Sequence, residues 1–117
     1  MPRRPLLKST LAFAAAVSLI ALCAPAFASG TDASEIRFEN HQFSPLTLTV
    51  PAGQPLHLKV INASNETIEF ESFKLNREKA ILPGEVITVG LPALSNGSYD
   101  FYDDFHQDVP EGSIVAK

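Results

Sequence analysis

The sequence predicts an all-β sandwich, and three observations lead to that fold class. Short runs of alternating apolar and polar residues recur along the chain, turn residues separate them, and no window shows the period of a long amphipathic helix. Seven runs are the expected strands, at residues 35–39, 46–50, 56–61, 67–73, 86–90, 98–103 and 112–116. Many short strands in so small a domain are typical of an antiparallel sandwich.

Turn residues stand between the expected strands. The clusters are PAG at 51–53, NASN at 62–65, PG at 83–84 and SNG at 95–97. Gly and Asn tolerate the positive φ that tight turns require, so these clusters predict chain reversals. Between the fourth and fifth expected strands, residues 74–80 have room for one short helical turn, and we expect Arg77, Glu78 and Lys79 to form a solvated loop.

The fourth expected strand, at 67–73, has carboxylates where its neighbours have ordinary polar residues. Ile68 and Phe70 take the core face, and Glu69 and Glu71 alternate onto the other. Residues at i and i+2 of a strand are about 7 Å apart. The two carboxylates are therefore close enough to share a cation.

The N-terminus is typical of a secretory signal peptide. Basic residues precede an apolar run at 11–22, and the A-x-A sequence at 26–28 predicts cleavage after Ala28. A membrane span needs about 18 or more apolar residues, and this run is shorter. A lipid anchor on Cys23 is disfavoured by the bulky Leu22 before it. We therefore divide the chain into a signal peptide at 1–28, a short polar tail at 29–34 and one domain at 35–117.

The remaining 89 residues are acidic and contain no Cys or Met. Six basic and thirteen acidic residues give a formal net charge of −7, which argues against binding nucleic acid or anionic membranes. Without Cys there is no disulfide or thiol nucleophile. The sequence also has no nucleophile-elbow, P-loop or dinucleotide-binding motif.

Three stretches resemble the cupredoxin family, in particular the EfeO-type cupredoxin-like domains of bacterial periplasmic iron-uptake systems. They are FSP at 43–45 leading into LTLTVPAG, VIN at 60–62 followed by TIEFE, and the closing GSYDFYDDFHQDVPEGSIVAK. The resemblance implies a cupredoxin-like Greek-key β-sandwich of about seven to eight strands, located in the periplasm.

The closing segment resembles the C-x-x-H-x-x-M loop of blue copper proteins, with one ligand kept. The match places Asp103 at the Cys position, His106 at the His position and Val109 at the Met position, and Glu69 stands for the upstream His. A blue copper site needs a thiolate, two imidazoles and an axial thioether. The mature chain has no sulfur ligand, so blue copper electron transfer is excluded.

Carboxylates with one imidazole instead suit iron or a non-blue copper ion. The first candidates for ligands are Glu69, Asp103 and His106, followed by Glu71 and Asp104, with His41, Glu66 and Glu78 as further candidates. Each has an ordinary alternative: the Glu residues as a solvated sheet face, the Asp residues as turn formers and the His residues as exposed loop residues.

The resemblance implies a role in iron acquisition, with an inner-membrane iron permease and other periplasmic iron-uptake components as partners. Two or three carboxylates stabilise Fe(III) over Fe(II) by charge, and a ferroxidase-like reaction at one metal would need a partner that accepts the electron. A non-catalytic metallochaperone or metal buffer is the first alternative. A metal-free sandwich used for protein interaction is the second.

Overall fold

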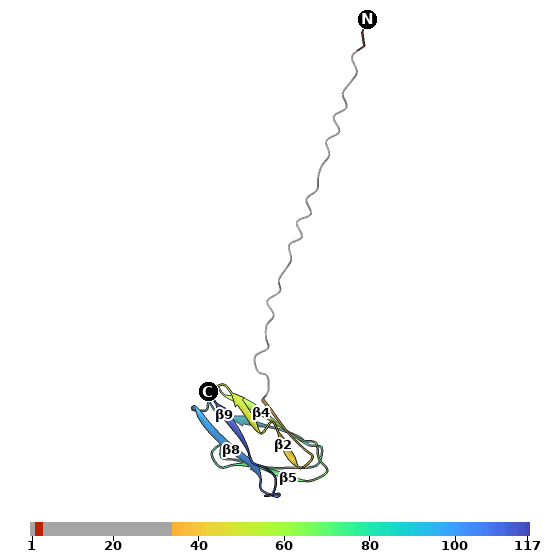
Figure 1. Cartoon of the computed structure of the whole chain (residues 1–117). Helices are drawn as coiled ribbons and strands as arrows, with labels where there is room; N and C mark the ends of the chain where they lie inside the picture. Colours follow the sequence, from red (N-terminus) through yellow and green to blue (C-terminus); the bar gives the residue numbers. More distant parts are fainter. Residues whose placement is uncertain (1, 4–33) are drawn as a thin grey trace.

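A computed structural model describes residues 2–3 and 34–117. The expected signal peptide at 1–28 and tail at 29–34 therefore lie outside the described residues, apart from their few end positions. The strands are β1 (Ser34–Glu39), β2 (Gln42–Ser44), β3 (Thr47–Val50), β4 (Leu56–Asn62), β5 (Ile68–Ser72), β6 (Arg77–Ile81), β7 (Val86–Leu91), β8 (Gly97–Asp103) and β9 (Gly112–Ala116). The predicted all-β sandwich is confirmed (Figure 1). In the described part, no helix is long and apolar enough to cross a membrane.

The strands form two sheets that are mixed rather than antiparallel. One sheet has the order β2-β1-β4-β7 and the other the order β3-β9-β8-β5-β6. β1 runs parallel to β4, and β3 runs parallel to β9. The purely antiparallel expectation is wrong at these two pairs, because the chain leaves the first sheet for β3 before it returns as β4. Alternation within a strand assigns its faces but not its neighbour.

Two strands were missing from the sequence prediction, and one replaces an expected helical turn and loop. Residues 77–81 form the edge strand β6, which pairs with β5. A tight turn precedes it, in which Asn76 has a φ of 54° and its N–H donates to the Phe73 carbonyl at 3.0 Å. Only Ile81 of β6 is buried. An edge strand with one buried residue lacks the alternation that predicts a strand.

Four phenylalanines fill the centre of the sandwich. Phe43 lies edge-on to Phe38 and to Phe101, with ring centroids 5.1 and 5.2 Å apart, and Phe70 lies 5.4 Å from Phe101. All four rings are almost completely buried. Burial of each such ring contributes about 1.5–3 kcal/mol to folding, so these rings fix how the two sheets stack.

The last strand passes directly over one of these rings. A Cβ atom built on Gly112 would lie 2.1 Å from the Phe101 ring, which no side chain tolerates. Glycine is therefore required at the start of β9, where the closing loop returns to the sheet.

Candidate metal-binding site

β5 separates the predicted ligands onto two sides of one sheet. Ile68 and Phe70 are buried, while Glu69 and Glu71 are half-buried on the opposite face. This is the alternation that the sequence predicts. The neighbouring strand β8 pairs Phe70 with Asp103 and Glu71 with Tyr102. Asp103 therefore shares the inner face with Phe70.

On the outer face, three carboxylates form what we call the acidic cluster: Glu69, Glu71 and Asp104. Asp104 directly follows β8 and extends its pairing, because its N–H donates to the Glu69 carbonyl at 3.0 Å. One ligand oxygen from each of the three residues lies within 4.8 Å of the others. Glu78 joins them from β6, where it stands opposite Glu71.

Within residues 34–117, no ion pair compensates the acidic cluster. Among the ion pairs of the described chain, none involves Glu69, Glu71, Glu78 or Asp104. A hydrogen bond with Glu78, burial and the surrounding negative charges raise the pKa of Glu69 to about 7. A proton thus relieves part of the repulsion. A bound divalent or trivalent cation would relieve more of it, because it carries more charge and contacts several carboxylates, and it would displace that proton.

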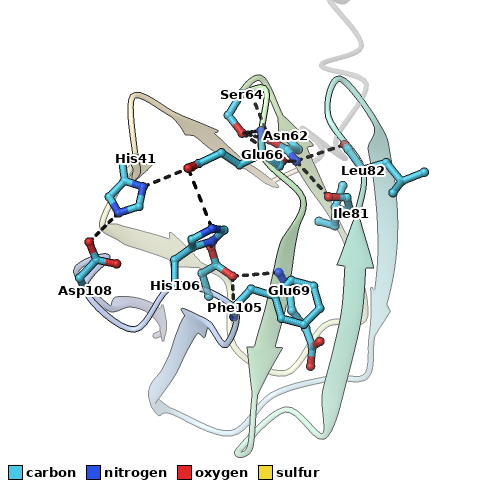
Figure 2. Close-up of polar contacts among 11 residues, drawn as sticks. His41, Asn62, Ser64, Glu66, Glu69, Ile81, Leu82, Phe105, His106 and Asp108 are labelled. Carbon is cyan, nitrogen blue, oxygen red and sulfur yellow. Dashed lines mark hydrogen bonds and ion pairs between the residues drawn. The ribbon is translucent and has the colours of Figure 1, made fainter.

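At the end of the sandwich, five residues form a second group, which we call the loop-end network (Figure 2). Acids and imidazoles alternate along it in the order Asp108, His41, Glu66, His106 and Asp103. His41 Nε2 lies 2.8 Å from Asp108 and His41 Nδ1 lies 3.2 Å from Glu66. The two imidazole rings are 5.6 Å apart between centroids.

Local structure explains how His41 reaches this network. β1 and β2 are joined by a two-residue turn in which Asn40 and His41 have φ values of 53° and 59°. Positive φ at both central residues is typical of a type I′ turn, whose twist matches that of the strands. The turn fixes the His41 backbone beside the β4–β5 and β8–β9 loops.

Asn62 holds the loop that carries Glu66. Its side chain is completely buried, and its amide nitrogen donates to the carbonyls of Glu66, Ile81 and Leu82 at 2.7, 3.0 and 3.1 Å. One buried amide therefore ties the β4–β5 loop to the end of β6 and positions the Glu66 side chain.

Asp103 is the buried anchor of the loop-end network. Its side chain is 1% exposed, and its Oδ1 accepts the backbone N–H groups of Glu69 at 2.9 Å and Phe105 at 3.1 Å. Its Oδ2 lies 2.6 Å from His106 Nδ1. The remaining His106 nitrogen, Nε2, faces Glu66 Oε1 at 4.0 Å. A carboxylate behind an imidazole is the arrangement that orients metal-binding histidines.

The exposed half of the network shifts two titrations in opposite directions. Hydrogen bonds to Asp108 and Glu66 raise the pKa of His41. The hydrogen bond with His41 lowers the pKa of Asp108. Both shifts favour the charged pair.

The structure thus divides the predicted ligands and does not gather Glu69, Asp103 and His106 at one point. Glu69 lies with Glu71, Asp104 and Glu78, while His106 lies with Asp103, His41 and Glu66. The Glu69 backbone N–H donates to Asp103, and Figure 2 shows the Glu69 carboxylate pointing away from the imidazoles.

Asp108 is not among the ligands predicted from the sequence. Its one sequence signal is its place in the same acidic loop, two residues after His106.

Known proteins identify the family. A family model described as a cupredoxin-like domain matches residues 12–116. The chain belongs to the cupredoxin-like family. An uncharacterized protein of Rickettsia prowazekii is 38% identical to this cupredoxin-like chain over 82 residues, which cover 70% of the chain and 66% of the relative. The chain thus spans slightly less than two thirds of that relative.

Two solved structures share the cupredoxin-like fold at low identity. The metal-binding domain of the Cu(I)-exporting P-type ATPase CopA from Streptococcus pneumoniae, solved with Cu(I), has a TM-score of 0.63 and 15% identity, covering 71% of this chain and 82% of that domain. A purple cupredoxin from Nitrosopumilus maritimus has a TM-score of 0.57 and 18% identity, covering 72% and 99%. These similarities establish the fold.

A blue copper centre does not fit the residues of this cupredoxin-like domain. Asp103 and Val109 stand where the resemblance places the sulfur ligands, and both side chains are buried. Both Asp103 oxygens already accept hydrogen bonds from within the protein. The domain instead carries an acidic cluster whose oxygen donors suit a harder metal ion.

Proposed function

We propose that this cupredoxin-like protein binds a transition-metal ion at the acidic cluster, without blue copper chemistry, and that it handles iron for uptake. The observation that carries the proposal is the convergence of Glu69, Glu71 and Asp104, with ligand oxygens within 4.8 Å of one another and no basic partner among the described ion pairs. Three carboxylates form a site that binds hard cations through oxygen.

The charge of the acidic cluster favours ferric over ferrous iron. Each carboxylate interacts more strongly with a trivalent than with a divalent ion, so the site would lower the reduction potential of bound iron. If bound Fe(II) is oxidised to Fe(III), one electron leaves the site and must pass to an acceptor on another protein. The metallochaperone or buffer alternative involves the same binding without that electron transfer.

The loop-end network is the second candidate site for the metal. The observation in its favour is the His106 imidazole, which Asp103 holds through Nδ1 at 2.6 Å while Nε2 faces Glu66. With His41 on the other side of Glu66, two imidazoles and a carboxylate surround one region. Such donors suit Cu(II), Zn(II) or Fe(II).

The proposed cellular role is delivery of iron to a permease in the inner membrane. Resemblance to EfeO-type domains and the signal-like leader support a periplasmic location and an inner-membrane iron permease as the eventual recipient. The metal-free interaction module remains the competing account of the same fold.

Calorimetric titration of the metal-free protein tests these proposals, with Fe(II) and Mn(II) under anaerobic conditions and with Cu(II) and Zn(II) in air. Glu71→Gln is expected to weaken Fe(II) and Mn(II) binding at least ten-fold, while His106→Ala leaves it within two-fold. Glu39→Gln, which changes an exposed carboxylate of the other sheet, is the matched control.

If His106→Ala abolishes binding and Glu71→Gln does not, the metal site belongs to the loop-end network. Absence of saturable binding for all four ions would leave the interaction module as the surviving account. Fe(II) oxidation with an added electron acceptor then separates the roles: equal rates for wild type and Glu71→Gln contradict a ferroxidase-like activity.

A further inference from the structure

An aromatic pair, one ring exposed and the other half-buried, lies on the outer face of the five-stranded sheet. Phe73, in the turn after β5, is 80% exposed, and its ring centroid lies 6.1 Å from that of Tyr102 on β8, with the rings tilted by 39°. A phenylalanine with this exposure gains little from folding, because its ring stays in water. Its ring is therefore available to a binding partner.

The pair stands between two adjoining grooves. One groove, of about 560 Å³, runs toward Glu78 and Asp104, and the other, of about 410 Å³, runs toward Lys74 and Asp100. Phe73, Tyr102 and Glu111 line both. The two rings therefore form a ridge that a ligand in either groove would touch.

The grooves are strongly negative. Five accessible carboxylates line them, from Glu71, Glu78, Asp100, Asp104 and Glu111, beside the buried Asp103. The one ammonium group in the lining is that of Lys74, which donates to the Ser98 carbonyl at 3.0 Å.

We propose that this face docks a cationic segment of a partner protein, with an arginine or lysine side chain lying on the Phe73–Tyr102 ridge and its neighbours paired with the flanking carboxylates. Aromatic faces attract guanidinium and ammonium groups, and the carboxylates supply complementary charge along both grooves. The proposal does not need a bound metal, although Glu71 and Asp104 of the acidic cluster line the first groove and would be shared with a metal ion.

Two other occupants are disfavoured by charge. A second copy of this chain would bring five more carboxylates against the same five, and like charges across an interface oppose association. An anionic membrane surface would be repelled in the same way. A cationic protein segment is the occupant that the face complements in both charge and aromatic character.

Fluorescence anisotropy tests the proposal. A fluorescein-labelled nonapeptide of alternating Gly and Arg is titrated with chelator-treated full-length protein in about 0.15 M salt. We expect one saturable site and roughly ten-fold weaker binding by Phe73→Ala, because the cation loses its aromatic contact. The control is Leu82→Ala, which removes another exposed apolar side chain (60% exposed) and is expected to bind within two-fold of wild type.

Three results would overturn the proposal. The first is the absence of saturable binding. The second is equal binding by Phe73→Ala and wild type, which would indicate attraction by overall charge. The third is the formation of concentration-dependent dimers in sedimentation that Phe73→Ala abolishes. As a second probe, Glu111→Gln should weaken binding more than Glu39→Gln does, and equal effects would also contradict a defined groove. Because metal is removed throughout, failure of the metal proposal leaves this test intact.

Discussion

Asp103 and Asp104 are consecutive in the chain, yet only the region around Asp103 has imidazoles between its carboxylates. Asp103 is 1% exposed and accepts hydrogen bonds from two backbone N–H groups and from His106. Asp104 is exposed and faces Glu69 and Glu71. The two carboxylates point to opposite faces of the sheet because side chains alternate along a strand.

A cation gains more binding energy in the acidic cluster than in the loop-end network. In the loop-end network, imidazoles already separate the carboxylates, so an incoming metal must displace existing contacts. In the acidic cluster the carboxylates face one another, and a metal relieves repulsion as it binds. The number of potential ligands is similar, but the balance of charge before binding is not.

Substitution of the two aspartates should separate the regions most sharply. Asp103→Ala leaves the N–H groups of Glu69 and Phe105 without their acceptor in a buried place, which costs about 2–4 kcal/mol of unfolding free energy. Asp104→Ala removes an exposed side chain from a like-charged group and should change stability by less than about 0.5 kcal/mol. Urea unfolding at pH 7 measures both.

In the same experiment, Asp103→Asn should recover part of the loss, because the amide oxygen still accepts the two backbone hydrogen bonds. Equal destabilisation by Asp103→Ala and Asp104→Ala would contradict the structural role assigned to Asp103.

The pH dependence of stability should reveal the acidic cluster. The pKa of Glu69 is raised from 4.5 to about 7 in the folded protein, so the folded state holds this proton more tightly than the unfolded chain does. The stabilisation is complete below about pH 4.5 and is lost as the pH rises through 7. Glu69→Gln should flatten the fall in unfolding free energy across this window, measured by urea unfolding of the metal-free protein.

The matched control for that measurement is Glu39→Gln, which should leave the slope unchanged. A wild-type slope that persists in Glu69→Gln would show that another group titrates in this window.

The smallest effect is expected in the exposed half of the loop-end network. Hydrogen bonds to Asp108 and Glu66 raise the pKa of His41 above 6.5, and Asp108→Asn removes the larger cause. The midpoint of the His41 imidazole titration, followed by NMR, should therefore move downward toward 6.5. His57, in the middle of β4, serves as the internal reference, and an equal movement of its midpoint would contradict a local effect.

Much of the fold could be predicted because most strands obey one local rule. Ile68 and Phe70 alternate with Glu69 and Glu71, and the structure places them as that alternation requires. The edge strand β6 has one buried residue, so its sequence has no such pattern. Parallel pairing of β1 with β4 depends on the path between the sheets, which local alternation does not encode.

The candidate site also depends on information that the local sequence pattern does not contain. The family resemblance predicted that Glu69, Asp103 and His106 meet, because it orders residues along the chain without giving their faces. The alternation of β8 held the missing information: Phe101 points inward, so Asp103 two residues later does too. Asp108 was missed because its partner, His41, is 67 residues away.

The position of β9 governs the order in which this protein can assemble. β9 lies between β3 and β8 and pairs Thr47 with Ser113 and Val50 with Ala116. During synthesis, β3 emerges long before the strand that hydrogen-bonds to it, and it has no neighbour in its own sheet until the final residues are available. Because such distant pairs form slowly, completion of the sheet waits for the C-terminal strand. Loss of only those last residues would leave β3 as an unpaired edge open to other chains.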